Sequence, residues 1–177
     1  MSDEIAVLGV VENTYVVSDD ERTGWFRRRA VERTITFLDW TIDGRPLREL
    51  VADVDGRVPS EVTVLQNRGA APGVGRDVLR LLLGRSVGDE FSIVMPDGRA
   101  PILLCSMCFD LECATLTAEV VWHDDRAEWR DVAWQVARDD LHLEDSDFEP
   151  TTIVFDRAQY ESLIHGLLLN ELEVADG

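Results

Sequence analysis

Apolar and polar side chains alternate along residues 115–122 and again along residues 128–136, and this pattern predicts a β-hairpin. Leu116 and Val120 share one side of the first segment, a period of two that is typical of a half-buried strand. Residues 124–126 then form the loop of the hairpin. We expect this hairpin to lie at the centre of the fold.

The register of the hairpin follows from keeping its apolar side chains on one face. A shift by one residue would turn the large apolar side chains of the second strand toward the polar side. The favoured pairs are Leu116 with Trp134, Ala118 with Val132 and Val120 with Arg130. Trp134 is therefore predicted to be buried beneath the C-terminal helix, and Trp129 to point the other way.

Further apolar runs predict two more single strands and a second hairpin. Residues 5–17 form one, and residues 32–42 form another. A second hairpin is predicted from residues 90–95 and 100–104, because the sequence Pro-Asp-Gly-Arg at residues 96–99 favours a reverse turn.

Helical spacing of apolar residues predicts three helices. The first is short, at residues 46–51, and the second covers residues 77–83 and ends at Gly84, a residue type common just after a helix. The third begins after Asp156, which can cap the helix, with Gln159 at the third helical position. Its apolar stripe, which should pack on the sheet, consists of Tyr160, Leu163, Ile164, Leu167 and Leu168.

Together these elements predict an α+β fold: a mainly antiparallel, twisted sheet of about six or seven strands with the C-terminal helix packed on one face. At 177 residues, the chain is long enough for one well-buried core and short for two. We therefore expect a single domain over residues 1–177.

The chain is strongly acidic, with a net charge of −18 at pH 7, and all 17 of its basic residues are arginine. Its negative potential disfavours nucleic acid and anionic membranes and favours a basic partner protein. Residues 139–149 form the most acidic segment, predicted to be a solvated loop. The first residues lack a signal-peptide pattern, no stretch is long enough to span a membrane, and the number of cysteines is odd. These features predict a cytoplasmic protein.

The three cysteines, Cys105, Cys108 and Cys113, have C-x2-C-x4-C spacing. They could bind Zn²⁺ if His123 supplied the fourth ligand, because zinc prefers thiolate and imidazole in a tetrahedron. Alternatively, Cys108 or Cys113 near His123 and Asp110 could be the nucleophile of a cysteine-dependent enzyme. Buried, inert cysteines are the commoner outcome. The sequence therefore favours no cofactor and no catalytic residue.

Residues 105–117 read CSMCFDLECATLT, residues 129–135 read WRDVAWQ and residues 155–160 read FDRAQY. These segments resemble a family of small bacterial proteins, common in actinobacteria and firmicutes, with a C-P-x-C-G-D-L-G-C-G-A-x-T core followed by a W-x-D-F-x-W/F-E-like strand. The resemblance covers roughly the C-terminal third to half of the chain. The family has no assigned activity, so the resemblance implies a fold and no mechanism. Its turn glycines are replaced here by Phe109, Glu112 and Ala114.

In the absence of a catalytic constellation, the sequence favours a non-enzymatic, acidic protein-binding module similar to an inhibitor or immunity protein. The predicted interaction surface consists of Trp129, Asp124 and Asp125 on the central hairpin. Zinc binding through the C-x2-C-x4-C segment is the alternative function, and a cysteine-dependent enzyme is the remaining one.

Overall fold

The computed structural model describes residues 4–22, 28–53, 55–87, 93–137, 141–142 and 148–175. Within this part of the chain the protein has an α+β fold, with nine strands in two sheets and three helices. The predicted fold class and C-terminal helix are confirmed. The strands divide between a larger and a smaller sheet, whereas the sequence pattern suggested one.

The larger sheet contains six strands, and the predicted hairpin lies at its centre. β6 (Thr115–Trp122) pairs antiparallel with β7 (Arg126–Val136), which also pairs antiparallel with β9 (Thr151–Asp156). The order across the sheet is β1-β9-β7-β6-β5. The sixth strand, β8, pairs with β7 but is not part of this order. Three strands of this sheet are short: β1 (Ile5–Ala6), β5 (Ala100–Leu103) and β8 (Leu141–His142). β1 runs parallel to its neighbour β9.

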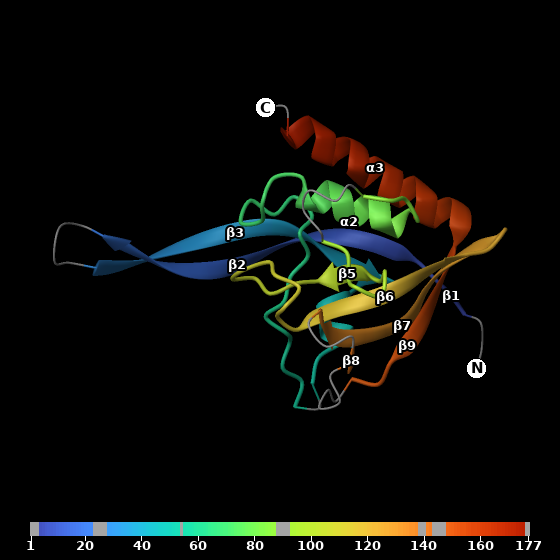
Figure 1. Ribbon diagram of the computed structural model, residues 1–177, viewed down its shortest axis with the longest axis horizontal. Helices are drawn as coiled ribbons and strands as arrows, with labels where there is room; N and C mark the ends of the chain where they lie inside the picture. The colour runs from blue at the N-terminus through green and yellow to red at the C-terminus, as the bar shows by residue number, and fades with distance from the viewer. Residues whose placement is uncertain are drawn as a thin grey trace.

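The smaller sheet is a long two-stranded ribbon with a short third strand. β2 (Leu8–Arg22) and β3 (Arg28–Ile42) pair along their whole length, and β4 (Arg45–Pro46) pairs with the end of β3. Figure 1 shows the ribbon projecting to one side of the molecule, with its base against the helices and the larger sheet. Asp43 and Gly44 form the turn between β3 and β4, and both have positive φ angles.

Three helices accompany the sheets: α1 (Leu47–Leu50), α2 (Val74–Leu82) and α3 (Arg157–Ala175). α2 and α3 pack against each other and lie on the same side of the sheets (Figure 1). α2 begins three residues earlier than the sequence pattern indicated and ends, as predicted, just before Gly84. Gly84 has a φ of 66°, a conformation that glycine adopts without strain.

The start of α3 has the predicted cap. The backbone N–H of Gln159 donates to Oδ1 of Asp156 over 2.9 Å, and the rings of Phe155 and Tyr160 pack with centroids 5.4 Å apart. These contacts are the N-cap and hydrophobic staple expected from the sequence. The side-chain amide of Gln159 donates instead to the carbonyl of Leu8 over 2.6 Å, which ties α3 to β2.

The pairing of β6 with β7 departs from the predicted register near its middle. Leu116 lies opposite Trp134 as predicted, but Val120 lies opposite Trp129, one residue away from its predicted partner. β7 contains one extra residue here, a β-bulge, in which Asp131 has a φ of 52°. Because side chains alternate along a strand, the extra residue turns the side chains beyond it to the other face. Both tryptophans of β7 therefore lie on one face of the sheet.

Trp129 is completely buried, so the prediction that it points away from the core is wrong. Its indole packs edge-on against Trp40 and Phe155, with centroids 5.7 Å and 5.2 Å apart. Its Nε1 donates to the hydroxyl of Tyr160 over 2.9 Å, and that hydroxyl donates to the carbonyl of Leu82 over 3.0 Å. Trp129 thus joins both sheets, α2 and α3 at the centre of the core.

Arg99, in the turn before β5, holds the bulge in place. Its guanidinium is almost buried and forms an ion pair with Asp131, with 3.1 Å between Nη1 and Oδ2. It also donates to the Asp131 carbonyl, to the Thr117 carbonyl and, over 2.9 Å, to the Thr117 hydroxyl. A bulge disrupts the ladder of hydrogen bonds between strands, and Arg99 supplies donors where the ladder is interrupted.

Two sequence predictions fall partly outside the described residues. Within the predicted strand at residues 90–95, residues 93–95 are described and are not in a strand, whereas residues 90–92 lie outside the described part. The turn that follows is confirmed, because the N–H of Gly98 donates to the carbonyl of Met95 over 2.8 Å. Most of the acidic segment at residues 139–149 also lies outside the described part.

Candidate metal centre

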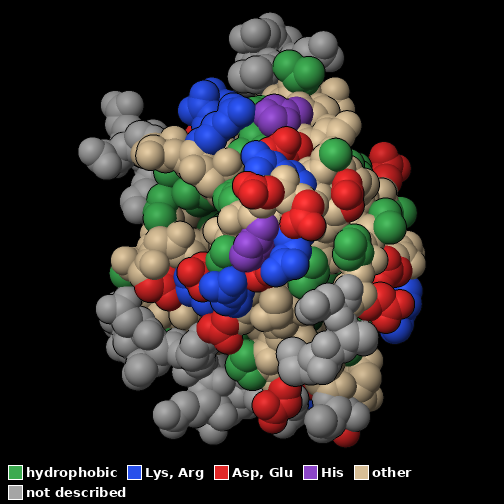
Figure 2. All heavy atoms as spheres, turned by 90° about the vertical axis from the view of Figure 1, so that its right-hand side faces the viewer, with side chains coloured by type: hydrophobic (Ala, Val, Ile, Leu, Met, Phe, Trp, Pro, Cys, Tyr) green, Lys and Arg blue, Asp and Glu red, His purple; other side chains and the backbone are tan. Residues whose placement is uncertain are grey.

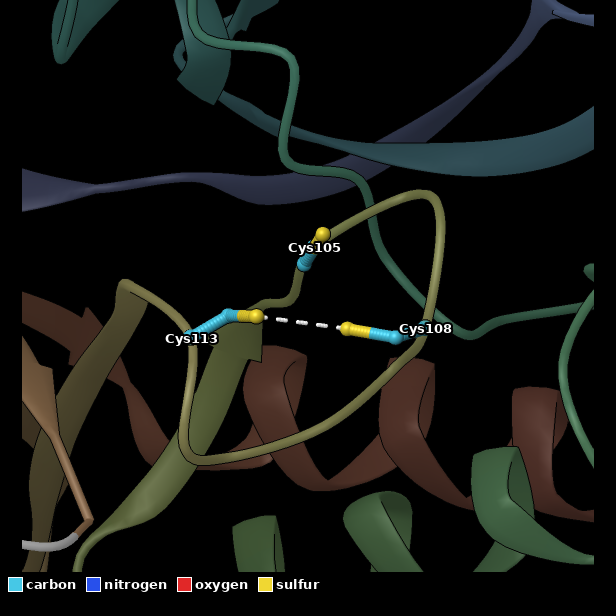
Figure 3. Close-up of side chains that lie close together, drawn as sticks. All are labelled: Cys105, Cys108 and Cys113. Atoms are coloured by element: carbon cyan, nitrogen blue, oxygen red, sulfur yellow. Dashed lines mark hydrogen bonds between the residues drawn. The ribbon is translucent and has the colours of Figure 1, made fainter.

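The loop between β5 and β6 brings the three cysteines together. The Sγ atoms of Cys105, Cys108 and Cys113 all lie within 4.8 Å of one another, and those of Cys108 and Cys113 are 3.3 Å apart. Figure 3 shows Cys108 and Cys113 facing each other from opposite sides of one loop, with Cys105 at the start of the same loop. Among the described residues, these cysteines form the one group of His, Cys, Asp and Glu side chains close enough to hold a metal ion together.

Backbone hydrogen bonds fix the start of this loop. Leu104 and Val62 exchange two backbone hydrogen bonds of 2.8 Å, which hold the residue immediately before Cys105. The N–H of Phe109 then donates to the carbonyl of Cys105 over 3.0 Å. This tight turn returns the chain toward its starting point, so that Cys108 comes back to Cys105.

The far side of the loop is anchored by two apolar side chains. Phe109 and Leu111 are half-buried and pack against the hydrophobic core, and the carbonyl of Leu111 accepts a hydrogen bond from the N–H of Ala137. Phe109 has a φ of 52°. A left-handed backbone is strained for a side chain of this size, and the packing around it offsets that strain.

The thiols are not buried, whereas the sequence favoured buried cysteines. Cys108 is exposed, and Cys105 and Cys113 are half-buried. The neighbouring Met107 is also exposed. Ions and small oxidants can therefore reach the cluster from solvent at Cys108.

Two of the thiols have shifted pKa values. Burial raises the pKa of Cys105, but hydrogen bonds from the N–H groups of Met107 and Cys108 and from the other two thiols outweigh it, so this pKa lies below its ordinary value. The hydrogen bond to Cys108, then burial and the nearby sulfurs, raise the pKa of Cys113 to about 12. Like charges this close oppose one another's ionisation. A bound cation would remove that opposition.

The structure does not place His123 at this site. β6 lies between Cys113 and His123, and a strand of eight residues spans about 25 Å. Instead, Nε2 of His123 lies 2.9 Å from Oε1 of Glu128. The carboxylate of Asp110 accepts a hydrogen bond from the N–H of Glu112. His123 is therefore not near enough to be the candidate fourth zinc ligand, nor to pair with a cysteine in the alternative of a cysteine-dependent enzyme.

Glu128 is the centre of an ion network on the hairpin. Its side chain is almost buried, and its oxygens lie 3.1 Å from Nε of Arg126 and 2.9 Å from Nη2 of Arg130. Burial raises the pKa of Glu128, but the hydrogen bond from Arg130, the charge of His123 and the hydrogen bond from Arg126 outweigh burial and hold this pKa below its ordinary value. The network uses local charges to satisfy a carboxylate that would otherwise be costly to bury.

Asp124 and Asp125 are exposed in the hairpin turn. The N–H of Arg157, at the start of α3, donates to the Asp125 carbonyl over 3.1 Å, and its Nη1 donates to the His123 carbonyl over 2.9 Å. Figure 2 shows arginine, acidic and histidine side chains interleaved on this face. Because Trp129 is buried, the predicted interaction surface is reduced to two aspartates in surroundings of mixed charge.

Trp134 lines a surface cavity that the sequence did not indicate. The cavity has a volume of about 400 Å³, and its other walls come from residues 51–53, residues 57–61 and Phe148. Trp134 is half-buried, whereas the sequence predicted it to be buried beneath α3. Walls contributed by segments this far apart in the chain leave no local sequence pattern, which is why the cavity was not predicted.

Comparisons of the chain with protein-family models, with curated proteins and with solved structures found no match. No helix in the described part of the chain is long and apolar enough to cross a membrane. A function is therefore inferred from the side chains of this protein alone.

Proposed function

We propose that the protein binds one Zn²⁺ ion through the thiolates of Cys105, Cys108 and Cys113. The observation that carries this proposal is the approach of the three Sγ atoms to within 4.8 Å of one another on one loop. Thiolates are among the preferred ligands of zinc, and side chains that converge without a cation between them repel one another once they ionise. Metal binding relieves that repulsion.

The spacing of the sulfur atoms suits a tetrahedral ion. A Zn–S bond of about 2.3 Å requires sulfurs that are about 3.8 Å apart in a tetrahedron. The pair formed by Cys108 and Cys113 is 3.3 Å apart, and no pair in the cluster exceeds 4.8 Å. Movements on the order of 1 Å would bring all three thiolates to the ion, and the exposed side chain of Cys108 has room for its share.

Three protein ligands leave the fourth position of a tetrahedral zinc ion to water or to a ligand from outside. This arrangement is typical of zinc sites that act on a bound molecule, whereas structural zinc sites have four protein ligands. The described part of the chain brings no fourth His, Cys, Asp or Glu side chain to the cluster. The proposed site is therefore an open zinc centre at the surface.

Zinc binding is tested with protein that has been reduced and stripped of metal. We expect about one zinc per chain after dialysis against Zn²⁺. In competition with a chromogenic chelator, Cys108→Ser should weaken zinc affinity at least tenfold, about 1.4 kcal/mol, because the site loses one of its three thiolates. Ser106→Ala, on the same loop, is the matched control and should leave the affinity unchanged. Equal zinc affinity of the wild type and Cys108→Ser in this competition would contradict the proposal.

We also propose that the acidic surface binds a basic protein, as the net charge of −18 suggests. The exposure of Asp124 and Asp125 in the hairpin turn favours this second function. A basic protein captured from a lysate of the source cell should elute as salt rises, since salt screens attraction between exposed charges. Capture should weaken for the double variant Asp124→Asn, Asp125→Asn. Salt-insensitive capture, or no capture, would count against this second function.

A further inference from the structure

We propose that a peroxide converts Cys108 and Cys113 into a disulfide, and that this reaction releases the metal ion and makes zinc binding sensitive to oxidation. The release of zinc rests on the proposed function, whereas formation of the disulfide does not. The two sulfurs are already 3.3 Å apart. A disulfide bond is about 2.05 Å long, so the pair needs to close by only about 1.3 Å.

The loop assigns different roles to the two cysteines. Cys108 is exposed and can be reached by a peroxide, whereas Cys113 is half-buried beside it. Figure 3 shows the Cys108 and Cys113 side chains pointing toward each other across the loop, with Cys105 to one side. We therefore assign Cys108 as the thiol that reacts first and Cys113 as the thiol that resolves it.

The reaction balances with one molecule of peroxide. The thiolate of Cys108 attacks one oxygen of hydrogen peroxide, the O–O bond breaks, and hydroxide leaves and takes up a proton to become water. Cys108 is then a sulfenic acid. The sulfur of Cys113 attacks the Cys108 sulfur, the S–O bond breaks, and a second water leaves with the proton of Cys113. Two thiols are oxidised to a disulfide, and the peroxide is reduced to two waters.

The disulfide removes the ligands that the ion needs. A disulfide sulfur no longer carries the negative charge of a thiolate, and the thiolate is the form that binds metal. Oxidation leaves Cys105 as the one thiol of the cluster, and a single thiolate cannot hold zinc against a chelator. A reducing agent restores the two thiols and with them the site.

The cysteines can be followed in one proteolytic peptide. The chain has no lysine, and no arginine lies between Arg99 and Arg126, so trypsin releases all three cysteines in residues 100–126. Cleavage after Glu112 then separates Cys113 from the other two cysteines. A disulfide that involves Cys113 keeps the two halves linked until they are reduced.

The first experiment treats metal-free protein with hydrogen peroxide and maps the products by mass spectrometry. We expect an intramolecular disulfide that links the two halves of the peptide in the wild type and in Cys105→Ser, and none in Cys108→Ser. In Cys113→Ser the resolving thiol is missing, so Cys108 should remain a sulfenic acid that dimedone labels. A disulfide that includes Cys105, or no intramolecular disulfide, would overturn the proposal.

The second experiment treats zinc-loaded protein with peroxide in the presence of a chromogenic chelator. Zinc should be released as the disulfide forms, until less than about a tenth remains bound, and dithiothreitol should restore binding. If zinc stays bound while the disulfide forms, the proposed release of zinc is contradicted. If the metal-free protein forms the disulfide but never binds zinc, the proposed function fails and the reactive pair stands. If zinc binds but peroxide produces no disulfide, the oxidation proposal fails and the zinc site stands.

Discussion

Replacing Trp129 with alanine is expected to lower the free energy of unfolding by about 3–5 kcal/mol. The indole is fully buried between Trp40 and Phe155, so its removal opens a large cavity at the centre of the core. The hydroxyl of Tyr160 also loses the hydrogen bond from Nε1. Urea denaturation followed by far-ultraviolet circular dichroism measures the change without relying on the fluorescence of the residue that is removed.

Trp134→Ala is the matched control, because it removes the same side chain from the same strand. Trp134 is half-buried at the edge of a surface cavity, so its loss should cost only about 1–2 kcal/mol. Without the bulge, Trp129 would point away from the core and the order of the two effects would be reversed. A larger loss of stability for Trp134→Ala than for Trp129→Ala would therefore show that the register of β6 with β7 is wrong.

Replacing Arg99 with alanine is expected to lower the free energy of unfolding by about 3 kcal/mol. The variant removes the ion pair between Arg99 and Asp131 and the donors to the carbonyls of Asp131 and Thr117. Asp131 is partly exposed, so water can replace some of the lost interactions, and the cost is lower than for a fully buried pair. Thermal and urea unfolding both report the change.

Arg130→Ala is the control for Arg99. Arg130 lies in the same strand pair and also contacts a carboxylate, but its side chain is exposed, and Glu128 keeps His123 and Arg126 as partners. We expect a cost below about 1 kcal/mol. Similar costs for the two arginines would mean that Arg99 does not hold the bulge. If Arg99→Ala left the free energy of unfolding unchanged, the bulge would be stable without Arg99.

Features that depend on neighbouring residues could be predicted from the sequence. Alternation gave the two strands of the central hairpin, and residue types at fixed offsets gave the cap of α3 and the end of α2. Asp156 and Gln159 meet because they are three residues apart at a helix start, and the backbone hydrogen bond between them is present. Gly84 follows α2 for an equally local reason, its positive φ.

The bulge could not be predicted, because its cause lies elsewhere in the chain. It requires one extra residue at Asp131, and Arg99, more than thirty residues earlier, supplies the hydrogen bonds that hold it. The alternating pattern of β7 fits a regular strand equally well. A single added residue then turns Trp129 to the face that Trp134 already occupies, because side chains alternate with a period of two.

The division into two sheets has a similar explanation. An apolar run predicts a strand but not the strand with which it pairs, and the predicted strand at residues 5–17 contributes to both sheets. Val7 separates β1 from β2 and exchanges hydrogen bonds with Asp43, which holds the chain where it passes from one sheet to the other. This change of partner is a tertiary contact without a local pattern.

The candidate site was predicted in part. The C-x2-C-x4-C spacing offered three thiols as candidate metal ligands, but it could not show that the loop would bring all three sulfurs together. That convergence depends on the left-handed backbone of Phe109 and on the anchoring of the loop to the core. His123 is close to the cysteines in sequence, but the length of β6 separates it from them in the fold.

The most direct test of the metal centre is a titration of reduced, metal-free protein with Cd²⁺, which replaces zinc at thiolate sites and absorbs in the ultraviolet for each thiolate that it binds. We predict saturation at about one cadmium per chain, with an absorbance that corresponds to three thiolates. Cys105→Ser, Cys108→Ser and Cys113→Ser should each remove about a third of that absorbance. A titration without thiolate absorbance, or one that the three variants leave unchanged, would contradict a metal centre built from these cysteines.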